Sequence, residues 1–232
     1  MDEALSSPVL EALSDEERSR LLDRAVTRRL DRDEILFLAG HPGDRIYLVL
    51  SGVMKLAARD SEGRETILGL AVPGDLVGEV AALDGTTQPL DAVAMTPARL
   101  AGIEAETLLD VVCNNPLAGL WLARGVATRT RWICDAALER TSSEVPARLA
   151  GRLLDLAQLL GCRNGAHIDL ELPMAQSDLG RLAGMCRESA CKTMRRFKKQ
   201  GLLDYEGRKL RILRPDVLER IRCAGRGGGP SR

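Results

Sequence analysis

The stretch PMAQSDLGRLAGMCRESACKTMRRFKKQ, residues 173–200, decides the fold of the C-terminal part of the chain. Its apolar residues repeat at helical spacing in two blocks, residues 176–183 and residues 187–200. Gly184 breaks the pattern between the blocks, and Gly180 is small enough to let two helices cross closely. The positions expected to face inward are Leu179, Leu182, Ala183, Ala190, Met194 and Phe197. This spacing is typical of a helix-turn-helix.

The outward face of the second helix carries residue types that contact base edges and phosphates in duplex DNA. Arg187, Glu188 and Lys192 lie toward its N-terminal half. Arg and Lys donate to guanine N7 and O6 in the major groove, and Glu accepts from cytosine N4. The side chains expected at phosphates are Gln176, Ser177, Ser189, Arg195, Arg196, Lys198, Lys199, Arg208, Lys209 and Arg211. The alternative is an ordinary solvated basic face, but the preceding helix, the glycine turn and the Glu among the bases favour the DNA interpretation.

The sequence around this motif predicts the rest of a winged helix-turn-helix domain. The expected elements are a helix over residues 145–160 closed by Gly161, a strand over residues 167–172, and a hairpin of residues 202–205 and 209–213. The hairpin is the wing behind the second helix. The glycine-rich tail after Cys223, residues 224–232, is expected to be disordered.

Charge divides the chain at the same place as the helical pattern. Residues 1–144 carry 15 Lys and Arg against 24 Asp and Glu, whereas residues 145–232 carry 18 against 9, although the formal net charge is zero. Ser, Thr and Pro residues over 141–146 suit a hinge and a new helix start. We therefore expect a nucleic-acid-binding C-terminal domain attached to a domain with another task.

The N-terminal half has the pattern of a small antiparallel barrel or sandwich. Ser14 and Glu17 fit a capping box that opens a short helix running to about Val26. The apolar runs that follow are short and separated by glycine-bearing turns, and they cover residues 35–38, 46–50, 53–58, 66–72, 92–94 and 99–103. A helix is expected again over residues 105–113.

A long helix is expected over residues 117–140. At about 24 residues it would be roughly 36 Å long, which is more than a small barrel can cover. Apolar or small residues recur near heptad spacing at Leu120, Ala127, Cys134 and Leu138. Pairing of two such helices in a homodimer is the expected outcome, and a helix folded back on its own barrel is the alternative.

Composition excludes several classes of protein. No stretch reaches the roughly 18 apolar residues of a membrane span, and the acidic start carries no signal peptide, so a cytoplasmic protein is the default. Aromatic residues make up 3% of the chain, which argues against a binder that stacks single-stranded bases. His41 and His167 are the two histidines, and the six cysteines form no CxxC pair, so no metal site or catalytic set is expected. In such a protein the cysteines are expected to be reduced, many of them in the core.

The order of barrel, long helix, hinge and winged helix resembles the CRP/FNR family of bacterial transcription regulators. GHPGD at residues 40–44, followed by YLVLSG at 47–52, is similar to the family's first β-roll signature, and PGDLVGE at 73–79 is similar to its second. GMCRES at residues 184–189 looks like the start of the recognition helix in the cyclic-AMP-receptor branch.

This resemblance implies an α+β fold with four parts. They are an antiparallel β-roll of the cyclic-nucleotide-binding type (1–114), a dimerisation helix and hinge (115–144), a winged helix-turn-helix (145–223) and the tail (224–232). It also implies a homodimer on palindromic operators of the TGTGA type, acting as an activator or dual regulator with RNA polymerase as a partner. The branch uses an Arg, a Glu and a later Arg, and Lys192 replaces the last, which keeps the charge but loses the bidentate fork.

The effector site departs from the family pattern. Cyclic-nucleotide-binding members follow a Gly-Glu pair, here Gly78 and Glu79, with an Arg-Ser or Arg-Thr that holds the phosphate, but Pro89 and Leu90 stand there. No Lys or Arg occurs between Arg64 and Arg99, so a buried phosphate would lack a cation. We do not expect cyclic AMP to bind, and Glu79 has a purely structural role as its alternative. The residues expected around the effector are Gly78, Glu79, Val80, Pro89, Leu90, Ile133 and Cys134.

Other effectors and functions remain as alternatives. The first 112 residues contain no cysteine for an iron–sulfur cluster, and His41 alone does not indicate haem. Oxidation of Cys134 or Cys191 is a redox hypothesis, against which stands an inert buried thiol. The competing function is a nucleotide-binding or redox-sensing signalling protein whose winged helix mainly contacts other proteins.

Overall fold

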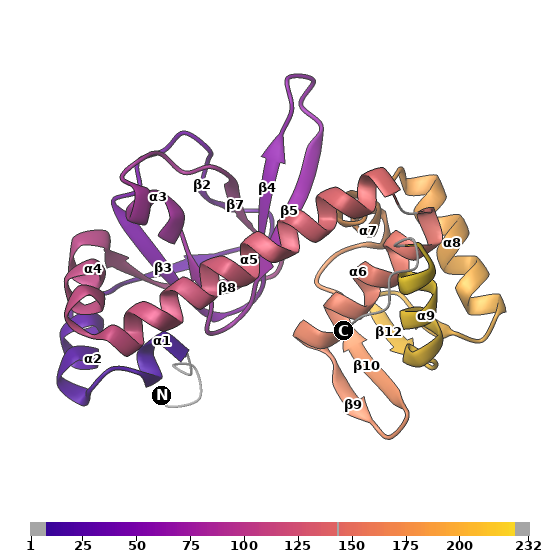
Figure 1. Cartoon of the computed structure of the whole chain (residues 1–232). Coiled ribbons are helices and arrows are strands. Elements are labelled where there is room, and N and C mark those ends of the chain that lie inside the picture. The colour runs from indigo at the N-terminus through magenta and orange to yellow at the C-terminus, as the bar shows by residue number, and fades with distance from the viewer. Residues whose placement is uncertain (1–7, 143, 226–232) are drawn as a thin grey trace. The chain divides into compact units, whose positions relative to one another are not determined.

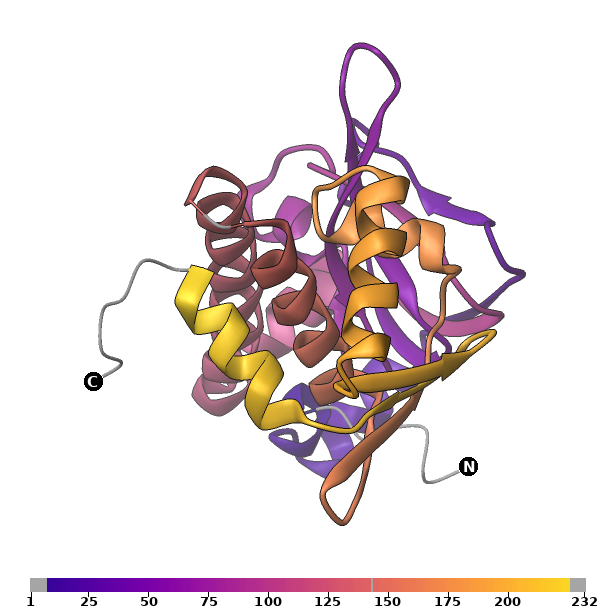
Figure 2. The ribbon, with the colours of Figure 1, turned by 90° about the vertical axis from the view of Figure 1, so that its right-hand side faces the viewer.

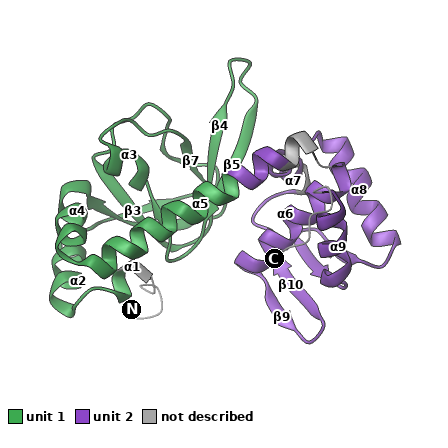
Figure 3. Cartoon of the chain, viewed as in Figure 1, with its two compact units in different colours: residues 1–133 green, residues 134–232 purple. Residues whose placement is uncertain are grey.

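The chain forms two compact units, residues 1–133 and 134–232, which are described separately (Figure 1, Figure 3). The computed structural model describes the backbone of residues 8–142 and 144–225, and within these ranges it describes all side chains except those of 8, 9, 139–142, 176 and 177. None of the helices in these ranges is both long enough and apolar enough to cross a membrane.

Unit 1 is built on two four-stranded antiparallel sheets. Their orders are β1-β8-β3-β6 and β2-β7-β4-β5. The strands are β1 (Val26–Leu30), β2 (Ile35–Phe37), β3 (Arg45–Ser51), β4 (Met54–Arg59), β5 (Glu65–Ala71), β6 (Leu76–Val77), β7 (Asp91–Ala94) and β8 (Ala98–Glu104). The expected antiparallel β-roll is confirmed, because each pair of neighbouring strands in both sheets is antiparallel.

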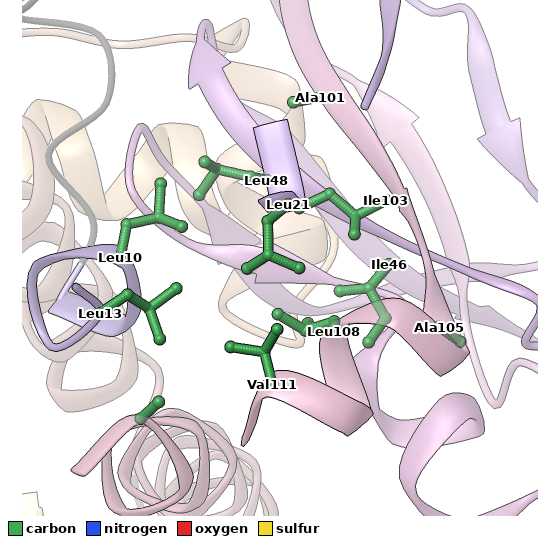
Figure 4. Packing of buried hydrophobic residues seen from close by; sticks show 11 residues of the cluster. Leu10, Leu13, Leu21, Ile46, Leu48, Ala101, Ile103, Ala105, Leu108 and Val111 are labelled. Atoms are coloured by element: carbon green, nitrogen blue, oxygen red, sulfur yellow. The ribbon is translucent and has the colours of Figure 1, made fainter. Parts of the chain in front are cut away.

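The central strands of the first sheet are buried on both faces. Successive strand residues point to opposite faces, so Leu48 joins one core cluster while Val49 joins the other. The first cluster packs the sheet against the N-terminal helices and α4, and Figure 4 shows Leu21, Ile46 and Leu108 meeting there. The second cluster fills the space between the two sheets.

The helices of unit 1 begin where local signals predict. They are α1 (Pro8–Glu11), α2 (Asp15–Leu22), α3 (Glu79–Asp84), α4 (Ala105–Asn114) and α5 (Pro116–Ser142), of which α5 continues into unit 2. The capping box is present, with Ser14 Oγ accepting from the Glu17 amide at 3.3 Å and Glu17 accepting from the Ser14 amide at 2.8 Å. The prediction that this helix runs to Val26 is wrong: α2 ends at Leu22, because Val26 pairs with Gly102 as the first residue of β1.

Unit 2 contains the predicted helix-turn-helix and wing. Its elements after α5 are α6 (Val145–Leu160), β9 (Cys162–Asn164), β10 (His167–Glu171), α7 (Gln176–Leu182), α8 (Arg187–Lys199), β11 (Leu203–Glu206), β12 (Lys209–Ile212) and α9 (Pro215–Gly225). The strands form one antiparallel sheet in the order β11-β12-β10-β9, so the wing hairpin is joined to a second hairpin. Figure 2 shows α8 at the surface of this unit, with the wing following its C-terminal end.

Two further expectations about unit 2 and the cysteines are wrong. The tail does not begin at residue 224, because α9 runs to Gly225 and packs on α6 through Leu218, which has no exposed surface; residues 226–232 lie outside the described part. The cysteines are not core residues. Five are exposed and Cys191 is partly buried, because they occupy outward or edge positions while Leu, Val, Ile and Ala fill the core.

Candidate nucleic-acid interface and ligand cavity

The turn between α7 and α8 depends on two glycines. Gly184 has φ +61°, a left-handed conformation that costs glycine nothing. Gly180 lies so close to the turn that a Cβ there would be 2.9 Å from the Met185 carbonyl oxygen. The Met185 amide donates to the Gly180 carbonyl at 2.8 Å. These contacts fix where α8 begins.

One face of α8 is buried and the opposite face is exposed. Ala190, Thr193, Met194 and Phe197 are buried, which matches the predicted inward positions and adds Thr193. The residues expected to meet bases, Arg187, Glu188 and Lys192, are all exposed on the other face. The buried face therefore orients the three polar side chains outward together.

The side chains expected at phosphates differ in how far they are occupied. Arg195, Arg196, Lys199, Arg208 and Lys209 are exposed, and none forms an ion pair within the described residues. The Ser189 hydroxyl accepts from the Cys186 thiol at 3.1 Å and keeps its own hydrogen to donate. Gln176 and Ser177 lie in the first turn of α7, and their side chains are outside the described residues.

Two of the basic residues expected at phosphates are already paired. Lys198 Nζ lies 2.5 Å from the Asp204 carboxylate and donates to the Tyr205 carbonyl at 3.3 Å, so it ties α8 to the wing. Arg211 donates to Asp169 at 2.6 Å across the sheet. The sequence could not show these pairings, because each joins residues of two elements that only the folded wing brings together.

Cys186 is the N-cap residue of α8 and is exposed. Its hydrogen bond with Ser189 lowers the pKa of the thiol below its ordinary value of 9.0, because the hydroxyl stabilises the thiolate. The redox hypothesis concerned Cys134 and Cys191. The thiol with the lowered pKa is a third one, which only the helix boundary reveals.

A cavity of about 280 Å³ lies in unit 1 beside α3 and α5. Six of the expected effector residues line it, namely Gly78, Glu79, Val80, Pro89, Leu90 and Ile133. Cys134 does not, because its side chain is exposed on α5 instead. The lining residues that the sequence did not reveal are Phe37, Leu56, Leu68, Gln88, Val126, Arg129 and Thr130.

An ion pair between α3 and α5 is the main polar feature of the cavity. Arg129 Nη1 pairs with Glu79 Oε1, and Arg129 Nη2 donates to the Leu76 carbonyl at 2.8 Å. The other carboxylate oxygen of Glu79, Oε2, is buried and has no hydrogen-bond partner. Close by, burial raises the pKa of the Asp75 carboxyl above its ordinary value of 3.8.

The expectation that the site lacks a cation is therefore wrong. The absence of Lys and Arg between residues 64 and 99 is real, but Arg129 reaches the cavity from the long helix. The arrangement still does not fit a cyclic phosphate. Glu79 neutralises Arg129, and the residues at the phosphate-binding position of the family, Pro89 and Leu90, offer no side-chain donor.

Among the described residues no three His, Cys, Asp or Glu side chains are grouped as a metal site would need. The polar groups of the two regions are thus suited to DNA on α8 and to a small organic molecule in the cavity.

Comparison with known proteins identifies both regions. A family model for the cyclic nucleotide-binding domain matches residues 27–115, and a model for the Crp-like helix-turn-helix domain matches residues 147–221. The chain is therefore a regulator in which a domain of the cyclic-nucleotide-binding type is joined to a DNA-binding helix-turn-helix. It belongs to the CRP/FNR family of transcription regulators.

Individual relatives agree along most of the chain. The chain is similar to the CRP-like cAMP-activated global transcriptional regulator of Mycobacterium tuberculosis (strain ATCC 25618 / H37Rv), with 29% identity over 201 residues, which cover 84% of this chain and 90% of that protein. The solved structure of a CRP-family transcriptional regulator from Thermus thermophilus matches with a TM-score of 0.69 and 26% identity, covering 84% and 96%. CooA from Carboxydothermus hydrogenoformans shares the fold, with a TM-score of 0.77 at 20% identity, covering 94% and 96%.

Proposed function

We propose that this protein is a homodimeric transcription regulator that binds palindromic operators through α8 and responds to a small-molecule effector in the cavity. The observation that carries the proposal is the exposed face of α8, where Arg187, Glu188 and Lys192 stand beside basic residues without ion pairs. In this assignment residues 1–114 sense the effector, 115–144 dimerise and hinge, and 145–223 bind DNA. The similar proteins named above are regulators rather than enzymes, which fits a chain without catalysis.

The proposed dimer rests on an exposed stripe along α5. Leu117, Leu120 and Leu138 are exposed by 61%, 47% and 64%, and Ala127 and Cys134 lie between them at heptad spacing and are also exposed. Two parallel copies of such a stripe pack against each other around a two-fold axis. The axis would then bring Cys134 of one protomer opposite Cys134 of its partner.

Cross-linking tests this arrangement. A short bismaleimide should convert most of the protein into a covalent dimer, and Cys134→Ser should abolish the dimer band. Cys162→Ser, which removes an exposed cysteine of unit 2 on β9, is the matched control and should cross-link like the wild type. A dimer band that depends on Cys162 and not on Cys134 would contradict the proposed interface.

Activation with RNA polymerase as partner is the mode we propose, since relatives carry the description of transcriptional activators. The effector is proposed to differ from cyclic AMP, because the Arg129 charge is neutralised by Glu79 within the cavity.

A gel shift at several salt concentrations tests the DNA-binding proposal. The probe is a duplex with two inverted TGTGA half-sites whose centres are about one helical turn apart, with a scrambled duplex as control. Five basic side chains without ion pairs per protomer give at most ten phosphate contacts per dimer, so log K should fall against log salt with a slope of up to about −9. A salt-independent or absent shift on both duplexes would contradict DNA binding and favour a protein-binding winged helix.

A further inference from the structure

The buried carboxylate of Glu79 lacks a partner for one of its oxygens. The side chain is 3% exposed, and Oε2 has no hydrogen bond within the described structure. An unsatisfied buried oxygen on an ionised group is costly, and native proteins rarely keep one without a use. Because Glu79 lines the cavity, a bound molecule can satisfy this oxygen by donating to it.

The rest of the cavity wall is largely apolar. Phe37, Leu56, Leu68, Leu90, Val126 and Ile133 supply most of it. Arg129 is the one Lys, Arg or His among the lining residues that the structure describes. Its Nη1 and Nη2 atoms already donate to Glu79 and to the Leu76 carbonyl. An anionic ligand would compete with Glu79 for Arg129, and a cationic ligand would lie beside an arginine.

We propose that the cavity binds a compact, uncharged and mainly apolar molecule that donates one O–H or N–H to Glu79 Oε2. The inference rests on the proposed function, in which this cavity is the effector site. Its volume of about 280 Å³ is at the low end of the range of roughly 300–1,000 Å³ for small-molecule sites, which favours a ring-sized ligand over an extended one. Burial against the apolar wall supplies affinity, and the single donor supplies orientation.

Three related probes separate the ligand classes. Naphthalenemethanol is neutral and carries one hydroxyl donor, its methyl ether lacks the donor, and naphthalenecarboxylate is an anion. Binding to the full-length protein is measured by calorimetry, with cyclic AMP as a fourth ligand. We expect the alcohol to bind at least about tenfold more tightly than the other three, as a hydrogen bond to a charged group predicts.

Variants locate the binding. Glu79→Gln should weaken the alcohol about tenfold and strengthen the carboxylate, because the amide no longer neutralises Arg129. Glu106→Gln makes the same change at an exposed position of α4 and should behave like the wild type. Leu90→Trp fills the cavity and should abolish binding of the alcohol, which keeps the test decisive if Glu79→Gln does not fold.

The outcomes also separate this inference from the proposed function. Tighter binding of the carboxylate or of cyclic AMP, equal binding of alcohol and ether, or no binding of the alcohol would each overturn the ligand class. Operator binding by the same protein samples tests the regulator independently. Alcohol binding without any operator binding would support the ligand class and overturn the proposed function instead.

Discussion

Replacing Gly180 with alanine tests whether the helix-turn-helix depends on a close approach between α7 and the turn. The new Cβ would lie 2.9 Å from the Met185 carbonyl oxygen and 3.5 Å from the Arg187 amide nitrogen. The first distance is too short for a relaxed contact with a backbone atom, so the turn must move. Alanine gains about 1 kcal/mol over glycine in a helix, whereas overpacking costs about 1–3 kcal/mol. We expect a net loss of up to about 2 kcal/mol.

The matched control is the same substitution at Gly119 in α5. There the nearest atoms to a new Cβ are the Val112 carbonyl oxygen at 3.5 Å and Cγ1 at 3.7 Å, which are ordinary contacts. Gly119→Ala should therefore raise the free energy of unfolding by about 0.5–1 kcal/mol. Because the start of α8 carries Arg187, Gly180→Ala should also weaken operator binding, and Gly119→Ala should not.

Thermal unfolding followed by circular dichroism measures the difference. For a unit of this size each kcal/mol shifts Tm by roughly 4–8 °C. The two variants should therefore move Tm in opposite directions. A Gly180→Ala protein that gains as much stability as Gly119→Ala and keeps its operator affinity would refute the close approach.

Three further predictions concern α8 and the wing. Phe197→Ala should lower the free energy of unfolding by about 3–5 kcal/mol in urea denaturation, since the ring is fully buried, and a loss below about 1 kcal/mol would contradict that burial. The Lys198–Asp204 pair lowers the pKa of Asp204 below 3.8 and raises that of Lys198 above 10.5, so its stabilisation is complete between those values and is lost as pH falls through the depressed carboxyl pKa or rises through the raised lysine pKa. Hydrogen exchange of the wing should show this loss at acid pH in the wild type and not in Asp204→Asn. Iodoacetamide should alkylate Cys186 faster than the partly buried Cys191, as mass spectrometry of the labelled peptides would report; faster labelling of Cys191 would contradict the assignment.

Local patterns in the sequence predicted the elements well. The capping box at Ser14 and Glu17 spans four residues, and the amphipathic repeat of α6 lies within one helix, so both can be recognised without knowledge of the fold. The helix-turn-helix followed from the glycines and the inward spacing of α7 and α8. Strand β1 was missed because Val26–Leu30 is held by its pairing with β8, far along the chain.

The candidate site was predictable only in part. The sequence motif around Gly78 and Glu79 located one wall of the cavity. The Arg129 partner of Glu79 lies 50 residues away, on a helix whose cavity-facing side depends on packing, so no local pattern marks it. The same reason explains Cys134, whose helix face was assigned wrongly. Long-range contacts, rather than residue types, decide these positions.

The central claim is that α8 reads bases through its N-terminal residues and holds phosphates through basic residues nearer its end. The most direct measurement compares Arg187→Ala with Lys199→Ala on the palindromic duplex, on duplexes with single base changes and at several salt concentrations. Arg187→Ala should lose about 1–3 kcal/mol per half-site and accept altered bases at one position. Lys199→Ala should weaken all duplexes alike and reduce the magnitude of the salt slope by about 1.8 for the dimer. Relaxed sequence choice in Lys199→Ala together with uniform weakening in Arg187→Ala would contradict the account.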